Sequence, residues 1–180
     1  MGSTRHLNYF PNHSASKIIL NDLSKNIREV QQLVGQNESI IILTSGDPLF
    51  FGFGRLLLAN LPGEKLRFHP HLSSIQLAFS RLKIPWQDAQ FISVHGRDVD
   101  ELIKVLQQGK EKIAILTDKT NNPSAIARLY LALSLPAEYT FFVCENLGSD
   151  AEKITSFASE EIEKLANLSQ VDFASLNVLV

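Results

Sequence analysis

The amino-acid sequence predicts an α/β fold built as two lobes, with a mostly parallel first sheet and a mixed second sheet. Short apolar runs of strand length alternate with helical segments up to about residue 135, which is typical of βαβ units. The remainder of the chain is more mixed and includes a predicted antiparallel pair. The chain has 180 residues, 44% of them hydrophobic, which is enough for a sizeable core. We expect the lobes to divide between residues 112 and 113.

The predicted first lobe covers residues 1–112. The apolar run Ile40 to Leu43 is rich in β-branched residues, which indicates a strand covered on both faces. Gly35 ends the helical pattern before it, and Pro62-Gly63 ends a strongly apolar helix after it. The predicted elements are a polar loop (1–16), a helix (20–34), a strand (40–43), a helix (49–61), a short strand (66–69), a helix (73–82), a strand (91–94) and a helix (99–106).

The predicted second lobe covers residues 113–180. Ile113 to Leu116 again has the pattern of a buried strand, and Pro123 stands where the first turn of a helix tolerates proline. Ser159 opens a helix with acidic residues in its first turn, where they interact favourably with the helix dipole. The predicted elements are a strand (113–116), a helix (123–135), a strand (139–143), its hairpin partner (154–157), a helix from residue 159 and a closing strand (178–180).

Composition argues against several classes of function. The formal net charge is -2 and no basic cluster is present, so a nucleic-acid surface is not expected and the ligand is expected to be a small molecule. No apolar run approaches the roughly 18 residues of a membrane span, and no signal-peptide layout is present. The single cysteine, Cys144, cannot form an internal disulfide, which favours a cytoplasmic protein.

Polar or glycine-rich turns follow four of the predicted strands. Ligands of open α/β sheets bind at the carboxyl ends of strands, so these turns are candidate contacts. Gly46 would let the backbone approach a ligand closely, and Asp47 can accept hydrogen bonds from hydroxyls or amines. A plain helix-capping turn is the alternative reading of this Gly-Asp-Pro segment. The four turns are Ser45-Gly46-Asp47-Pro48, His69 to Ser74, Thr117-Asp118 and Glu145 to Gly148.

Other chemical signatures are weak. The chain has neither a P-loop nor a Gly-x-Gly-x-x-Gly fingerprint, so an ordinary nucleotide-binding enzyme is not expected. His69-Pro70-His71 lacks a third ligand at metal-binding spacing, which favours a structural role. Cys144 precedes a carboxylate, so we expect a buried, unreactive thiol. Basic residues that could contact an anionic substrate, or be ordinary solvated surface, are Arg5, His6, His95 and Arg97.

Six segments carry a resemblance that covers nearly the whole chain. They are Arg5-His6-Leu7, the segment from Ser45 to Gly52, the segment from His69 to Phe79, Pro85-Trp86-Gln87-Asp88-Ala89, Ser93-Val94-His95-Gly96-Arg97 and Glu145-Asn146-Leu147-Gly148. In this order they resemble the tetrapyrrole methylase family of S-adenosylmethionine-dependent enzymes. The match is closest to the branch that methylates C5 of precorrin-6Y (cobalt-precorrin-7) in cobalamin biosynthesis.

The resemblance implies a fold, a cofactor and a set of contacts. The family has two α/β lobes, with S-adenosyl-L-methionine folded into the cleft between them. The implied substrate is a tetrapyrrole, the expected assembly is a homodimer, and a C15-methylating, decarboxylating domain is a possible partner. No catalytic base is assigned. The implied cofactor-binding residues are Ser45, Gly46, Asp47, Phe50, Ser73, Ser74, Thr117 and Leu147, and the expected substrate contacts are His95, Arg97 and Arg5.

One departure from the family pattern affects the expected function. The family opens with an apolar strand and a glycine-rich turn, and this chain begins beyond them, although Gly2 to Leu7 fits the family's Gly-x-x-Arg-His-Leu stretch. We therefore expect a first lobe that lacks its usual first strand. The alternatives to a C5-methyltransferase are a truncated, inactive binding domain and a methylase for another ring position.

Overall fold

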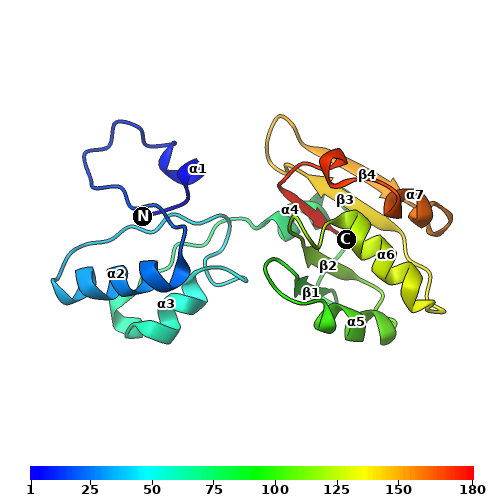
Figure 1. Ribbon diagram of the computed structural model, residues 1–180, viewed down its shortest axis with the longest axis horizontal. Helices are drawn as coiled ribbons and strands as arrows, with labels where there is room; N and C mark the ends of the chain where they lie inside the picture. The colour runs from blue at the N-terminus through cyan, green and yellow to red at the C-terminus, as the bar shows by residue number, and fades with distance from the viewer. The chain divides into compact units, whose positions relative to one another are not determined.

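The computed structural model describes residues 1–180, which divide into two units, Met1–Ser73 and Ser74–Val180 (Figure 1). This division differs from the boundary expected between residues 112 and 113. Residues 74–112 belong to the second unit because strand β1 (Gln90–Ser93) pairs in parallel with strand β2 (Ile113–Leu116). None of the helices combines the length and the apolar composition that a membrane span requires.

Three extended segments run parallel to one another in the first unit, with Met1–Gly2 in the middle. Gly2 exchanges backbone hydrogen bonds with Ile18 and Leu20, at 3.0 and 2.9 Å, and the Leu43 amide donates to the Met1 carbonyl at 2.8 Å. The strand expected at residues 40–43 is reduced to a bridge at Leu43, and it is not covered on both faces, because Ile41 is 74% exposed. The pairing is parallel and consists of isolated bridges rather than a full sheet.

Helices α2 (Leu23–Gly35) and α3 (Gly54–Asn60) cover these segments and pack against each other. Asp22 caps α2 by accepting a hydrogen bond from the Lys25 amide at 2.9 Å. The core of the unit includes Val30, which is 2% exposed, and Leu57. Two short elements complete the unit, helix α1 (Thr4–Leu7) and the 3₁₀ turn η1 (Gly63–Lys65).

Helix α3 begins at Gly54, five residues later than the predicted start at Leu49. The intervening residues form a tight turn, in which the Gly54 amide donates to the Pro48 carbonyl at 2.9 Å and Phe51 has a φ of 54°. A Cβ atom at Gly52 would lie 2.5 Å from the Pro48 oxygen, so only glycine fits there. The glycines of Gly52-Phe53-Gly54 thus permit close packing against the Pro48 carbonyl. The short strand predicted at residues 66–69 is absent.

The second unit is built on a five-stranded mixed sheet with the order β1-β2-β5-β3-β4. The pair β1–β2 is parallel, and the other neighbouring pairs are antiparallel. The mixed second sheet and its antiparallel hairpin are confirmed. The remaining strands are β3 (Phe141–Glu145), β4 (Lys153–Phe157) and β5 (Asn177–Leu179).

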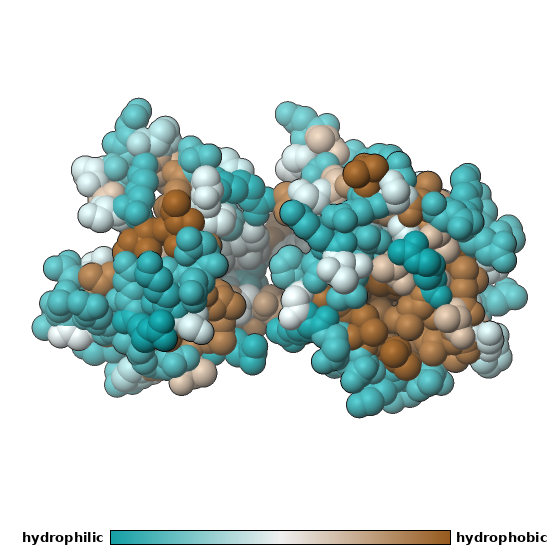
Figure 2. All heavy atoms as spheres, viewed as in Figure 1, coloured by the Kyte–Doolittle hydropathy of each residue, from teal (hydrophilic) through white to brown (hydrophobic).

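Helices cover both faces of this sheet. On one face, Ala78 of helix α4 packs with Cys144 and Val178. On the other face, the larger apolar cluster includes Leu102 and Ile126, and Figure 2 shows apolar side chains gathered around this part of the unit. The helical elements of the unit are α4 (Ser74–Leu82), α5 (Asp100–Gln107), α6 (Pro123–Leu133), η2 (Ser159–Glu161), α7 (Ile162–Ala166) and η3 (Gln170–Asp172).

Candidate functional site

The carboxyl ends of β2 and β3 lie at the same end of the second unit's sheet. Both strands are antiparallel to β5 between them, so Thr117 after β2 and Leu147 after β3 flank the start of β5. The buried Thr117 hydroxyl donates toward Asn177, with its Oγ1 lying 2.6 Å from the side-chain oxygen and 2.9 Å from the main-chain oxygen. Two predicted cofactor-binding residues are therefore fixed at the edge where ligands of α/β sheets bind.

The turn that carries Leu147 is held by an ion pair. Gly148, whose φ is +81°, donates its amide to Glu152 Oε2 at 2.7 Å, and Arg81 of α4 donates to the other oxygen at 2.6 Å. The Leu147 side chain is half-buried against the cluster of Ala78, Cys144 and Val178. The turn is consequently anchored to the helix that covers this face of the sheet.

Cys144 lies in that cluster and is fully buried. Burial raises the pKa of the thiol to about 12, and the carboxylates of Glu152 and Glu145 add to the effect. The expectation of a buried core thiol is confirmed. Cys144 is therefore not a nucleophile of this site.

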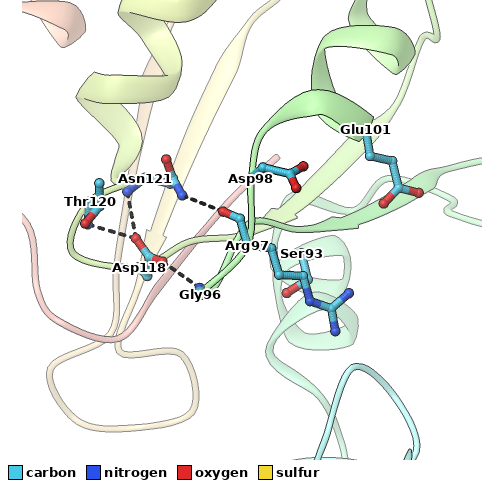
Figure 3. A pocket seen from close by; sticks show the side chains of 8 residues that line it. All are labelled: Ser93, Gly96, Arg97, Asp98, Glu101, Asp118, Thr120 and Asn121. Carbon is cyan, nitrogen blue, oxygen red and sulfur yellow. Dashed lines mark hydrogen bonds between the residues drawn. The ribbon is translucent and has the colours of Figure 1, made fainter.

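The predicted substrate residues His95 and Arg97 lie in the loop after β1. The His95 ring is 2.8 Å from the Thr117 carbonyl through Nδ1, and the Gly96 amide donates to Asp118 at 2.7 Å. Asp118 also accepts from the Thr120 amide at 2.8 Å, so it is a structural clamp between the loops after β1 and β2 (Figure 3).

These two loops line an open, shallow pocket of about 780 Å³. Figure 3 shows the Arg97 side chain on the same side of the loop as Ser93, with the carboxylates of Asp98 and Glu101 nearby. The lining contains one guanidinium and three carboxylates, and the Asp118 carboxylate already accepts hydrogen bonds from backbone amides. Any anionic ligand in this pocket depends on Arg97 for its charge complement. The lining residues are Ser93, Gly96, Arg97, Asp98, Glu101, Asp118, Thr120 and Asn121.

In the first unit, the structure brings two predicted cofactor loops into contact. Gly46 has a φ of +62°, and a Cβ atom there would lie 3.2 Å from the Ser73 Cα atom. The Gly46 carbonyl accepts a hydrogen bond from the His71 amide at 3.3 Å. Asp47 is oriented by the Leu49 amide, which donates to its carboxylate at 2.8 Å. The glycine is required both for its conformation and for this close approach.

Ser45 is exposed and has two basic neighbours. Arg5 donates to the Ser45 hydroxyl at 2.8 Å, and His6 Nε2 lies 3.1 Å from the same oxygen. Arg5 was predicted as a substrate contact, and here it contacts a predicted cofactor residue. His6 was noted in the sequence as one of several basic loop residues, and its link to Ser45 comes from folding across 39 positions of the chain.

The remaining predicted residues are placed as follows. Phe50 packs edge-on against Phe51 in the turn before α3, with ring centroids 4.9 Å apart, and Ser74 is the first residue of α4. Sequence reasoning missed Ser124, in the first turn of α6, whose buried hydroxyl has no hydrogen-bond partner. Its position in the sequence, just after the loop that begins at Thr117, could have indicated it as a candidate.

The scan of family models matches residues 4–163 to the tetrapyrrole (corrin/porphyrin) methylases. The match covers most of both units and includes all the segments described above except the extreme ends of the chain. The chain belongs to the tetrapyrrole methylase family. Its fold class and its recognition from the sequence are therefore confirmed.

Similar proteins of the family include two with curated names. A precorrin-6Y C(5,15)-methyltransferase [decarboxylating] of Sinorhizobium sp is 36% identical over 137 residues, which is 76% of this chain and 33% of that protein. A probable cobalt-precorrin-7 C(5)-methyltransferase of Methanocaldococcus jannaschii is 31% identical over the whole of this chain and 83% of its own length. The chain therefore spans about a third of the first relative and most of the second.

A solved structure shares the fold of this tetrapyrrole methylase. It is the uroporphyrin-III C-methyl transferase of Thermus thermophilus complexed with S-adenyl homocysteine, with a TM-score of 0.66 and 15% identity. The similarity covers 92% of this chain and 76% of that one. At this identity the likeness establishes the fold.

Proposed function

We propose that the protein is an S-adenosyl-L-methionine-dependent C-methyltransferase that acts on C5 of a corrin precursor, precorrin-6Y or cobalt-precorrin-7, in cobalamin biosynthesis. The observation that supports the proposal is the approach of Gly46 to Ser73, since the family resemblance implies both loops as cofactor contacts. The names of the relatives support the ring position and the substrate class.

The residues present fit such a cofactor. A nucleoside with ribose hydroxyls and an amino-acid group needs hydrogen-bond partners and a backbone that it can approach closely. Gly46 leaves that backbone uncovered by a side chain, and Asp47 offers an oriented carboxylate beside it. In the second unit, the unpartnered buried hydroxyl of Ser124 follows the loop of Thr117. We propose that the cofactor is held by Ser45, Gly46, Asp47, Phe50, Ser73, Ser74, Thr117 and Leu147.

The protein's own contribution is to orient the reactants and to exclude water. When bound, S-adenosylmethionine supplies an electrophilic methyl group, and alignment with a nucleophilic ring carbon can provide much of the acceleration. The turns at Gly46 and Gly148 suit this role because a backbone hydrogen bond from His71 holds the first and the Arg81–Glu152 ion pair holds the second. The buried Cys144 thiol is not needed as a nucleophile.

We propose that Arg97 and His95 contact the acidic side chains of the tetrapyrrole, together with Arg5. Arg97 supports this best, because it supplies the guanidinium of the pocket between the loops after β1 and β2. His95 is fixed beside it by its contact with the Thr117 carbonyl. We further propose, from the family resemblance, a cytoplasmic homodimer, which light scattering on the purified protein would check. A C15-methylating, decarboxylating partner domain is also proposed.

Two measurements test the proposed function. Isothermal titration with S-adenosylhomocysteine should show binding in the micromolar range, and transfer of a labelled methyl group should occur on the C5 precursor. Absence of detectable binding would instead identify a binding domain that has lost its cofactor site. Transfer to another ring carbon would keep the methyltransferase but reject the C5 assignment.

A further inference from the structure

Three side chains of the first unit form a continuous hydrogen-bonded series around an imidazole ring. His6 Nδ1 lies 3.0 Å from the Ser3 hydroxyl, and His6 Nε2 lies 3.1 Å from the Ser45 hydroxyl. Ser45 is exposed, whereas Ser3 and His6 are half-buried. The series therefore runs from the exposed Ser45 hydroxyl into the unit. The proposed function assigns Ser45 to cofactor binding and gives His6 and Ser3 no role.

The neighbours of the ring determine the direction of these hydrogen bonds. Arg5 can only donate, so the Ser45 oxygen accepts from it at 2.8 Å and its own proton is available to His6 Nε2. The Ser3 oxygen accepts from the His6 amide at 3.4 Å, which favours Nδ1–H as its second donor. In this arrangement the neutral ring carries its proton on Nδ1, and Nε2 is the acceptor, facing the Ser45 hydroxyl at 3.1 Å and Arg5 Nη2 at 3.4 Å.

The electrostatic environment also keeps the ring neutral. Burial lowers the pKa of His6 below its usual value, and the Arg5 guanidinium lowers the pKa further. Arg5 is the charged group in contact with the ring, and Ser3 and Ser45 contribute uncharged hydroxyls. The Met1 ammonium is engaged by the Ile41 carbonyl at 2.7 Å. At neutral pH the ring is consequently ready to accept a proton.

We propose that His6 is the proton acceptor of the methyl-transfer reaction, acting through the exposed hydroxyl of Ser45. The inference rests on the proposed function. Methylation of a ring carbon by a sulfonium adds one positive charge to the ring system, and loss of one proton returns the product to neutrality. In this step the carbon–sulfur bond breaks, the carbon–carbon bond forms with an electron pair of the ring system, and a ring proton passes to Ser45 Oγ. The Ser45 proton moves to His6 Nε2, and the resulting imidazolium releases it to solvent.

Two substitutions separate proton transfer from hydrogen bonding. His6→Asn keeps a donor for Ser3, and His6→Gln keeps an acceptor near Ser45, but neither amide can take up a proton at neutral pH. We expect both variants to lower kcat by about 100-fold or more, the range of general base catalysis, with KM within about threefold of the wild-type value. His13→Gln is the matched control, since His13 contacts the backbone of Ala15 in the same unit.

The pH profile provides the readout that a structural role would not change. In the wild-type protein kcat should rise with pH to a plateau, with a midpoint equal to the His6 pKa measured by NMR of the imidazole. Both His6 variants should lose this limb while still binding S-adenosylhomocysteine, and the control should retain it.

Three outcomes overturn the inference. Full activity of either His6 variant would show that hydrogen bonding suffices. A wild-type midpoint that differs from the NMR value would assign the limb to another group. Absence of both methyl transfer and S-adenosylhomocysteine binding in the folded wild-type protein would overturn the proposed function along with the inference, whereas active wild-type protein with unaffected variants would overturn the inference alone.

Discussion

The hydroxyl of Thr117 and the side-chain amide of Asn177 connect the ends of two strands at 2.6 Å. Asn177 in turn donates to the Ala174 carbonyl at 2.7 Å, which fixes the amide with its oxygen toward Thr117. The contact joins β2 to β5 at the end of the sheet where Leu147 also lies. A proposed cofactor residue is therefore also part of the framework of the second unit.

Replacing Thr117 with Val should destabilise the protein. Valine keeps the shape but leaves the half-buried Asn177 oxygens without the Thr117 donor, so the free energy of unfolding should fall by about 1–2 kcal/mol. Urea denaturation measures this change, and titration with S-adenosylhomocysteine should show weaker binding. Thr117→Ser is the control, because it retains the hydroxyl. Equal stability of the Val variant and the wild-type protein would contradict this account of the contact.

Replacing Gly46 with Ala should lower the free energy of unfolding by more than the cost of a positive φ alone. The left-handed conformation costs an alanine about 1 kcal/mol, and here the new Cβ atom would also press against Ser73 at 3.2 Å. Gly109 isolates the first effect, since its φ is +63° and nothing lies within 4 Å of its Cβ position. Both variants should lose stability in urea denaturation, but only Gly46→Ala should weaken S-adenosylhomocysteine binding. Equal effects on binding would remove Gly46 from the cofactor site.

Alkaline pH should destabilise the protein through Cys144. Its thiol has an ordinary pKa of 9.0 and a folded-state pKa of about 12, so between these values the unfolded chain loses a proton that the folded protein keeps. Stability is therefore retained below pH 9 and lost as the pH rises, by about 1.4 kcal/mol at pH 10. Urea denaturation at pH 7 and pH 10 measures the loss. The Cys144→Ala variant should show a smaller decrease, and an identical decrease in both proteins would argue against this contribution.

Replacing Arg97 with Ala should weaken tetrapyrrole binding and spare cofactor binding. The substitution removes the guanidinium from a pocket that retains the carboxylates of Asp98, Glu101 and Asp118, so the KM for the corrin precursor should rise by about 10-fold or more. Titration with S-adenosylhomocysteine should be unchanged. Lys104→Ala, which makes the same charge change at an exposed position of helix α5, is the control. Loss of both binding activities in the Arg97 variant would reject the assignment.

Local patterns in the sequence predicted the second unit well. Strand β2 is formed by the residues expected for it, and helix α6 begins at Pro123 with Asn122 as its cap. Both signals are local, because a four-residue apolar run and a proline at the first helical position can be recognised from a few neighbouring residues. The hairpin of β3 and β4 is likewise formed by segments that are near neighbours in the chain.

The features that sequence did not predict depend on distant contacts. The late start of α3 comes from glycines that press against the Pro48 carbonyl, which an apolar helical pattern does not reveal. The unit boundary depends on the pairing of β1 with β2, and apolar runs do not specify their partners. The contact between Gly46 and Ser73 could also be found only in the folded structure, because the two residues are distant in the sequence. The predicted roles of the site residues stay predictions until the experiments above are done.

The strand order has a consequence for the assembly of the protein during synthesis. β5 follows every other strand in the sequence, yet it lies in the middle of the sheet, between β2 and β3. The parallel pair β1–β2 and the hairpin β3–β4 can each form early, but they share no sheet edge until residues 177–179 leave the ribosome. The two half-sheets therefore keep unpaired edges until β5 is synthesised, and these edges are the part of the unit most open to mispairing before then.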